Sequence, residues 1–174
     1  ILKTKKNLRL IDGTNYTSRE FLKFLSFNQA IMIQSEDLNF FSKKNFKIVS
    51  KRKPTSKQFK DLIFAFNVCR YVKSNAIVLT SNETTVGIGS GQPSRIDSCQ
   101  IAINKMKKFN LQNNNLVAAS DAFFPFVDGI EKLVQSGVRA IVQPSGSIRD
   151  KEIINFANET NTVLLFSNTR HFRH

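Results

Sequence analysis

The clearest candidate for chemistry in this sequence is a glycine-rich stretch, "GIGSGQPSRID", at residues 87–97. Gly87, Gly89 and Gly91 would let backbone N–H groups approach an anion, because glycine carries no side chain. Ser94 begins a predicted helix, whose N-terminus favours negative charge, and Arg95 would add a planar cation suited to a phosphate. The spacing is not that of a Walker P-loop, so a plain turn followed by a helix cap is the alternative.

A second stretch, "SDAFFPFVD" at residues 120–128, combines aromatic rings with carboxylates. Phe123 or a neighbouring ring could lie against a planar ligand, and Asp128 could accept a hydrogen bond from it. The alternative is a hydrophobic staple and core packing at the entry to a helix. Asp121 stands at the predicted end of a strand, where it could instead be a buried structural carboxylate.

Two further loops follow apolar runs: "PSGSIRD" at residues 144–150 and "SNTRHFRH" at 167–174. The first could present backbone groups to the polar edge of a heterocycle, or form a turn in which Ser147 or Asp150 caps the next helix. Chain ends are usually frayed, and that interpretation suits Arg173 and His174. We expect the Arg170 guanidinium to bind a negatively charged group of a nucleotide and the Phe172 ring to make an apolar contact with it.

These loops are connected by regularly alternating predicted elements. The predicted strands cover residues 76–80, 84–89, 116–120, 140–143 and 163–166, with a hairpin joining the first two. The predicted helices run from the Thr55–Gln58 capping box through Cys69, from near Ser94 through Met106, from Val127 toward Gly137, and around Ile153, Ile154 and Ala157. This alternation predicts an α/β fold, a three-layer α/β/α sandwich with a mostly parallel central sheet. Ligands gather at the carboxyl ends of such strands, so we expect all four loops to meet at one edge.

The first fifty residues have a less regular pattern. Thr17 and Glu20 have capping-box spacing ahead of Phe21, Leu22 and Leu25, which predicts a short helix. "AIMIQ" and "FKIVS" predict strands, and "NLQNNN" at residues 110–115 predicts a polar loop. Asn75 precedes a predicted strand, where it could be a turn residue or an amide that binds a ligand carboxamide.

Composition limits the classes of protein that fit. The 174 residues have the size of one domain, and no apolar run approaches 18 residues, so we expect no membrane span. The chain begins with Ile1 and has no signal-peptide pattern, which we interpret as a fragment or a processed chain. Cys69 and Cys99 are predicted to be buried free thiols. Without a C-x-x-C pair or a nearby histidine, we expect no metal site and no zinc.

The formal net charge is +13, and residues 1–53 carry nine Lys and three Arg against four acidic residues. Such an excess fits a solvated lysine-rich surface or a surface that attracts small anions. A basic nucleic-acid-binding α/β module without enzymatic activity is the alternative, although the aromatic residues used for stacking on single strands are not interleaved with the lysines. A zinc deaminase would need a His/Cys-x-Glu and a Pro-Cys-x-x-Cys signature, and the sequence has neither.

Six ordered segments together resemble a known family: "KRKPT", "DLIFAFNVCRYVKSNAIV", "VGIGSGQPSRID", "ASDAFFPFVDGI", "QPSGSIRDKEII" and "RHFRH". They resemble the C-terminal part of the bifunctional purine biosynthesis family, which combines phosphoribosylaminoimidazolecarboxamide (AICAR) formyltransferase with IMP cyclohydrolase. The resemblance is strong from about Pro54 to the end and looser upstream. It implies that residues 54–174 are the second of two cytidine-deaminase-like units, and that residues 1–53 connect it to the first.

The resemblance also implies an activity and its ligands. The family transfers a formyl group from its co-substrate 10-formyltetrahydrofolate to AICAR, as a cytoplasmic homodimer whose sites are lined by both subunits, without nucleic-acid or membrane partners. Residues matching those that hold AICAR are Asn75, Arg95, Phe123, Arg170 and Phe172. Residues matching the folate side are Ile96, Asp128, Ser147 and Ile148.

The sequence departs from the family pattern at several points. The catalytic Lys-His pair of a "KHVNP"-like motif and the cyclohydrolase domain are absent from these residues. We therefore expect no catalytic residue in this chain and little or no formyl transfer by it alone. Val127 stands where the family usually has Arg, and Asn67 replaces a frequent Lys.

Overall fold

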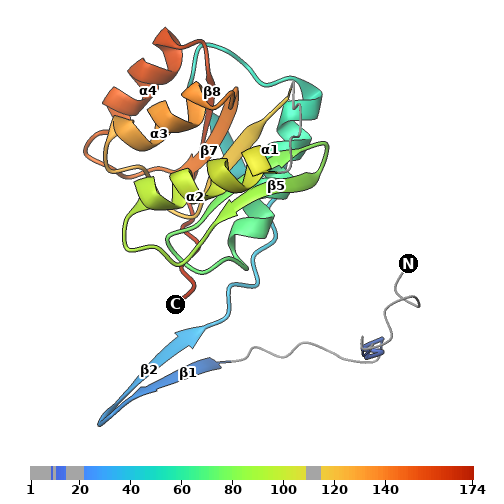
Figure 1. Cartoon of the computed structure of the whole chain (residues 1–174), viewed down its shortest axis with the longest axis vertical. Coiled ribbons are helices and arrows are strands. Elements are labelled where there is room, and N and C mark those ends of the chain that lie inside the picture. Colours follow the sequence, from blue (N-terminus) through green and yellow to red (C-terminus); the bar gives the residue numbers. More distant parts are fainter. Residues whose placement is uncertain (1–8, 10, 15–21, 109–114) are drawn as a thin grey trace. The chain divides into compact units, whose positions relative to one another are not determined.

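A computed structural model describes residues 9, 11–14, 22–108 and 115–174 of the chain (Figure 1). It divides into two compact units, residues 1–38 and 39–174, which are described separately. The predicted capping box at Thr17 and Glu20, with Phe21, lies outside the described residues. So does most of the predicted polar loop at 110–115.

The described part of the first unit contains a β-hairpin. Strand β1 (Leu22–Phe27) pairs antiparallel with β2 (Ala30–Ser35), so the strand predicted for "AIMIQ" is confirmed. The helix predicted through Leu22 and Leu25 is wrong, because both residues lie in β1. The register places Phe24 opposite Ile33. Such aromatic and β-branched pairs favour strands, and pairing across the hairpin outweighs a local capping signal.

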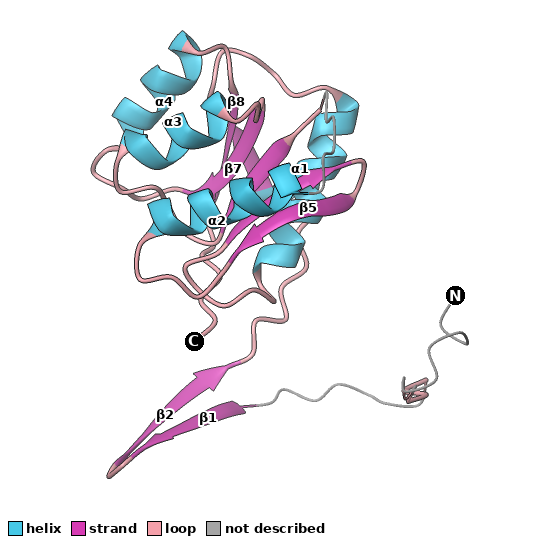
Figure 2. Ribbon diagram, in the orientation of Figure 1, coloured by secondary structure: helices cyan, strands magenta, loops and turns pink. Residues whose placement is uncertain are grey.

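The second unit is built on a six-stranded sheet in the order β3-β8-β7-β6-β4-β5 (Figure 2). The strands are β3 (Phe46–Ile48), β4 (Ile77–Ser81), β5 (Thr84–Gly89), β6 (Val117–Ser120), β7 (Ala140–Pro144) and β8 (Val163–Ser167). Each overlaps a strand predicted from the sequence, and β4 and β5 form the predicted hairpin.

The prediction of a mostly parallel sheet needs correction. Only the β6–β7 and β7–β8 pairs are parallel, whereas β3–β8, β4–β6 and β4–β5 are antiparallel. A two-residue turn at Asn82 and Glu83 joins β4 to β5, and such a turn can connect only antiparallel strands. Because β4 opposes both of its neighbours, β5 still runs in the same direction as β6, β7 and β8. The loops after these four strands therefore share one edge of the sheet, called here the loop edge.

Helices cover both faces of this sheet, so the predicted three-layer α/β sandwich is confirmed. Helices α2 (Arg95–Lys108), α3 (Val127–Gln135) and α4 (Asp150–Glu159) share one apolar cluster with the sheet, and α1 (Ser56–Cys69) packs on the opposite face. The predicted capping box starts α1, where the Thr55 hydroxyl accepts a hydrogen bond from the Gln58 N–H. Gly137 follows α3 with a φ of +101°, as expected for a residue that ends a helix.

The second unit begins at Asn39, earlier than the boundary expected at residue 54. Two contacts explain the difference. Phe41 is buried in the cluster beneath α1, and β3 forms an edge of the sheet by pairing with β8. Residues 39–53 therefore complete the core of this unit.

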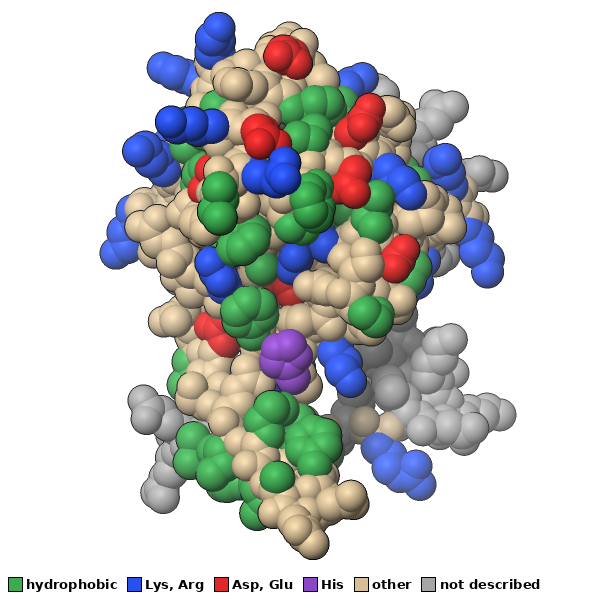
Figure 3. Space-filling model, turned by 90° about the vertical axis from the view of Figure 1, so that its left-hand side faces the viewer, with side chains coloured by type: hydrophobic (Ala, Val, Ile, Leu, Met, Phe, Trp, Pro, Cys, Tyr) green, Lys and Arg blue, Asp and Glu red, His purple; other side chains and the backbone are tan. Residues whose placement is uncertain are grey.

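Cys69 and Cys99 are free and buried, as predicted, and the structure places them on opposite faces of the sheet. Burial raises the pKa of Cys99 to about 12 and that of Cys69 well above its ordinary value, so both remain neutral thiols. None of the helices in the described ranges is long and apolar enough to cross a membrane. On the face of the second unit seen in Figure 3, Lys and Arg side chains are scattered among Asp and Glu rather than gathered in one patch.

Candidate functional site

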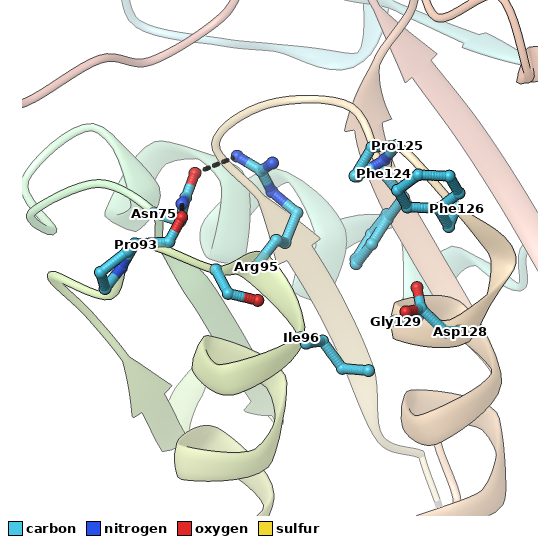
Figure 4. A pocket seen from close by; sticks show the side chains of 10 residues that line it. Asn75, Pro93, Arg95, Ile96, Phe124, Pro125, Phe126, Asp128 and Gly129 are labelled. Carbon is cyan, nitrogen blue, oxygen red and sulfur yellow. Dashed lines mark hydrogen bonds between the residues drawn. The ribbon is translucent and has the colours of Figure 1, made fainter.

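A pocket of about 440 Å³ opens at the loop edge of the second unit (Figure 4). The start of α2 and the segment before it form one wall, and the segment leading into α3 forms the other. The lining residues are Asn75, Pro93, Ser94, Arg95, Ile96, Phe124, Pro125, Phe126, Asp128 and Gly129. Four predicted site residues, two from each predicted ligand side, therefore meet in one pocket.

Arg95, at the first position of α2, is held by three acceptors. Its Nε donates to the Ser120 hydroxyl at 3.0 Å, and its Nη2 donates to Asn75 Oδ1 at 2.8 Å and Asp121 Oδ1 at 3.0 Å. The Arg95 side chain is only 10% exposed. Within the described ranges Nη1 has no such acceptor. The guanidinium is therefore fixed in orientation and retains donor capacity for a further acceptor.

Asn75 connects the segment before β4 to the segment before α2. Its Nδ2 donates to the carbonyl oxygens of Gln92 and Pro93, both at 2.9 Å. Since both amide hydrogens are used within the protein, a ligand would meet Asn75 mainly through Oδ1, which Arg95 already engages. If Asn75 contacts a ligand carboxamide, as predicted, Oδ1 is therefore the atom that would accept the hydrogen bond.

Asp121, at the carboxyl end of β6, is a buried structural carboxylate, one of the interpretations open from the sequence. It is 0% exposed and forms an ion pair with Arg95. Its second oxygen, Oδ2, is buried and has no hydrogen-bond partner in the part of the chain that the structure describes. Our predicted site residues did not include Asp121, although its place directly after an apolar strand was a usable signal.

The glycines predicted to approach an anion have a different role. A Cβ on Gly89 would lie 1.8 Å from the Ser98 carbonyl oxygen, and one on Gly87 would lie 2.2 Å from that of Ala102. These two glycines therefore allow α2 to pack closely on β5. Gly91 has a φ of +69°, and its N–H donates to the Lys73 carbonyl at 2.8 Å. The glycines shape the turn and the helix packing, and the positive charge at the pocket comes from Arg95.

The α3 wall places aromatic rings and a carboxylate at the pocket. Phe124 is buried, whereas Phe126 is half exposed and lies 4.9 Å beneath the Arg149 guanidinium. Asp128, in the first turn of α3, accepts a hydrogen bond from the Gly129 N–H at 2.7 Å. Figure 4 shows Ile96 across the pocket from Asp128, so two of the four predicted folate-side residues face each other from different helices.

The remaining predicted residues lie outside the pocket lining. The Arg170 guanidinium lies 4.6 Å from the centre of the Phe123 ring, so these two form a separate pair. A Cβ on Gly146 would lie 3.4 Å from Arg170 Nη2, which brings the "PSGS" loop close to the same guanidinium. Phe172 is 44% exposed and its ring stacks on that of His174.

The "PSGS" loop is organised by Asp150, which accepts hydrogen bonds from the N–H groups of Gly146 and Ser147. The Ser147 hydroxyl accepts from the Arg149 N–H at 3.1 Å. The side chain of Ile148 is fully exposed. Ser147 and Asp150 thus stabilise the turn, but the prediction that one of them caps α4 is wrong, because the N-cap is Arg149 and Asp150 is the first residue of the helix.

The terminal segment is anchored, including a residue that we interpreted as frayed. Arg173 accepts a hydrogen bond from the Ser74 N–H at 2.9 Å and donates its own N–H to the Ser74 hydroxyl at 3.1 Å. No three His, Cys, Asp or Glu side chains in the described ranges gather as a metal site would require.

Comparison with known proteins shows which family this chain belongs to. The family model described as "AICARFT/IMPCHase bienzyme" matches residues 1–105, which is more than half of the chain. The chain belongs to the AICARFT/IMPCHase bienzyme family. The match includes the first 53 residues, where the sequence segments gave only a loose resemblance.

Similar proteins carry the name bifunctional purine biosynthesis protein PurH. The chain is 47% identical to that of Buchnera aphidicola subsp. Schizaphis graminum over 176 residues, covering 100% of this chain and 34% of the relative. It is 43% identical to that of Persephonella marina, covering 98% of the chain and 33% of the relative. It is 40% identical to that of Neisseria meningitidis serogroup C, covering 100% and 33%. The chain thus spans about a third of the length of these AICARFT/IMPCHase relatives.

Proposed function

We propose that this chain is the C-terminal part of an AICAR formyltransferase and that the pocket at its loop edge takes part in binding AICAR and 10-formyltetrahydrofolate. In this reaction the AICAR amine forms a bond to the formyl carbon, the bond from that carbon to the folate nitrogen breaks, and the amine proton is transferred to the folate. The family membership and the placement of the matching residues support this proposal.

The observation that carries the proposal is the fixed guanidinium of Arg95 in the pocket wall. AICAR carries a phosphate and folate carries glutamate carboxylates, and arginine binds both kinds of anion through charge-assisted hydrogen bonds, for which Nη1 of Arg95 is the remaining donor group. Asn75, Ser120 and Asp121 fix this group before any ligand arrives, which lowers the entropy lost on binding. Arg170, exposed above the Phe123 ring, would contribute a second cation to the nucleotide.

The size of the pocket bears on how the two ligands share it. A volume of about 440 Å³ lies within the usual range for one small-molecule site. We propose that Asn75 and Arg95 hold AICAR there and that Ile96, Asp128, Ser147 and Ile148 line the folate side. Exposed Ile148 and Phe172 would then be covered by the folate or by a second subunit of a homodimer. The dimer and a cytoplasmic location remain predictions.

These 174 residues lack the family's catalytic Lys-His pair, so we propose that they bind ligand without transferring the formyl group. The residues present would hold the nucleotide and the folate in position. The amine proton would have to be removed by groups supplied from elsewhere in the full-length protein.

Titration calorimetry of the chain with AICAR monophosphate tests the proposal. We expect Arg95→Ala and Arg170→Ala each to weaken binding at least about tenfold, because each removes a charge-assisted hydrogen bond to the ligand. Arg139→Ala is the matched control, since it removes one exposed positive charge just before β7, at the opposite edge of the sheet. Equal affinity in all four proteins, or no measurable binding by the unaltered chain, contradicts the assignment of this pocket.

The net charge of +13 supports a second candidate, a basic module that binds nucleic acid. That function predicts strongly salt-dependent binding to unrelated oligonucleotides that AICAR monophosphate does not displace. On the face seen in Figure 3 the basic side chains are scattered, so that face has no basic patch of the kind that such a module would use.

A further inference from the structure

The terminal segment contains one deeply buried side chain between two exposed ones. His171 is 1% exposed, whereas Arg170 and Phe172 on either side of it are exposed. The His171 ring centre lies 4.9 Å from that of Phe41, nearly perpendicular at 87°, and 4.5 Å from that of Phe66. The fourth residue from the end of the chain is therefore part of the core beneath α1.

The aromatic site that receives His171 is itself fixed. The side-chain amide of Asn67 pairs with the backbone of Phe41, accepting from its N–H and donating to its carbonyl, both at 2.9 Å. The rings of Phe41 and Phe66 meet edge to face with centres 4.9 Å apart. Asn67, which replaces a frequent lysine of the family, thus holds one wall of the site of His171.

Backbone hydrogen bonds tie the same segment to the loops that hold Arg95. The His171 N–H donates to the Asp121 carbonyl at 2.9 Å, and Arg173 is paired with Ser74. Ser74 directly precedes Asn75, and both Asn75 and Asp121 accept hydrogen bonds from Arg95. The same two stretches of chain, Ser74–Asn75 and Asp121, therefore hold both the terminal segment and the Arg95 guanidinium.

We propose that His171 is a positioning residue whose buried ring fixes the terminal segment and so holds Arg170 above Phe123. In an extended segment successive side chains point to opposite sides, so a ring directed into the core sends Arg170 and Phe172 outward. With the ring removed, the segment would be held only by its backbone hydrogen bonds to Asp121 and Ser74 and by the Arg170–Phe123 contact, so we expect it to open more often. The positioning of the segment stands on the contacts described above. Its consequence for AICAR rests on the proposed function.

Hydrogen exchange of the ligand-free chain tests the anchor independently of any ligand. In His171→Ala, we expect the amides of Ser74, residue 171 and Arg173 to exchange on the order of a hundredfold faster, while those of Val142 and Leu165 in the central strands keep their protection. His171→Phe should retain slow exchange, because a planar ring still fills the site between Phe41 and Phe66. Unchanged exchange at the three terminal-segment amides in His171→Ala overturns the proposal.

A variant outside the terminal segment distinguishes local opening of that segment from a general loss of stability. Phe41→Leu removes one ring of the site, and we expect it to speed exchange of the same three amides by a smaller factor. If the Val142 and Leu165 amides also lose protection in both variants in proportion to the terminal ones, His171 is part of the general core and the positioning role is overturned.

Calorimetry with AICAR monophosphate then tests the functional consequence. We expect His171→Ala to weaken binding about as much as Arg170→Ala, at least about tenfold, and the double variant to be little weaker than either single one. Additive losses would overturn the coupling between the two residues. Faster exchange in His171→Ala with no effect of either variant on affinity would support the anchor and refute the role of Arg170 in the proposed function.

Discussion

Two buried carboxylates lie at opposite edges of the same sheet, and their surroundings differ. Asp61, on α1, is 1% exposed and accepts from the N–H of Asn82 at 3.1 Å through Oδ2 and from that of Glu83 at 2.6 Å through Oδ1. Asp121, at the loop edge, pairs with Arg95 through Oδ1 only, and Oδ2 has no partner among the residues described.

The difference indicates what each carboxylate does. Asn82 and Glu83 both have positive φ, 55° and 51°, as a tight hairpin turn requires, and neither is glycine. Asp61 stabilises that strained turn, because each of its two carboxylate oxygens accepts a hydrogen bond from a backbone N–H of the turn. Asp121 instead stabilises the charge and orientation of an arginine beside a pocket. Asp61 therefore holds the hairpin turn, whereas Asp121 orients Arg95, which lines the pocket at the loop edge.

The largest expected effect comes from removing the buried partner of Arg95. Asp121→Ala should lower the free energy of unfolding by about 3–5 kcal/mol, because it leaves a buried guanidinium without its counter-charge. Urea denaturation followed by circular dichroism measures this loss. Asp121→Asn should lose less, since its amide oxygen can still accept from Arg95. A stability loss below about 1 kcal/mol in the alanine variant would contradict the importance of the ion pair.

A smaller effect is expected at the opposite edge. Asp61→Ala should lower the free energy of unfolding by about 2–3 kcal/mol, because two backbone N–H groups of the turn lose their acceptor. Denaturation by urea measures the change, and calorimetry should show unaltered affinity of the folded protein for AICAR monophosphate. A loss of affinity as large as that of Arg95→Ala would mean that the two edges are not separate in function.

The smallest effect is expected at the start of α1, near Asp61. Thr55→Ala removes the acceptor of the Gln58 N–H and should cost about 1 kcal/mol of unfolding free energy without changing ligand affinity. Thr55→Ser keeps the hydroxyl and serves as the matched control. Equal stability of Thr55→Ala and the unaltered chain would show that the capping box adds nothing to the stability of this helix.

Local patterns predicted much of the second unit. Strands such as "AIVLT" were recognisable as continuous apolar runs, and Thr55 with Gln58 marked the start of α1. The shared edge of four loops followed from the alternation of strands and helices. The directions in which the strands pair could not be predicted from these local patterns. Strand β4 is antiparallel to both β5 and β6, and its pairing with β6 depends on strands that are distant in sequence.

The candidate site was predicted in part. Asn75, Arg95, Ile96 and Asp128 line one pocket, as the grouping of loops suggested. Neither interpretation of the glycine-rich stretch, anion binding or a plain turn, included the packing of Gly87 and Gly89 beneath α2, because a glycine at a loop and a glycine beneath a packed helix have the same local sequence signal. Roles for these residues toward AICAR and folate stay predictions until binding is measured.

The sequence by itself determined the elements of this protein and the residue types at their ends, because capping, apolar periodicity and turn preferences act over a few neighbouring residues. Tertiary structure alone decided which side chains support one another. Arg95 meets Asp121 across 26 positions, and Asn67 meets Phe41 across the same separation. His171 shows the consequence most clearly, since no local pattern tells a buried histidine near a chain end from a frayed one. Its burial depends on Phe41 and Phe66, which only the folded chain brings to it.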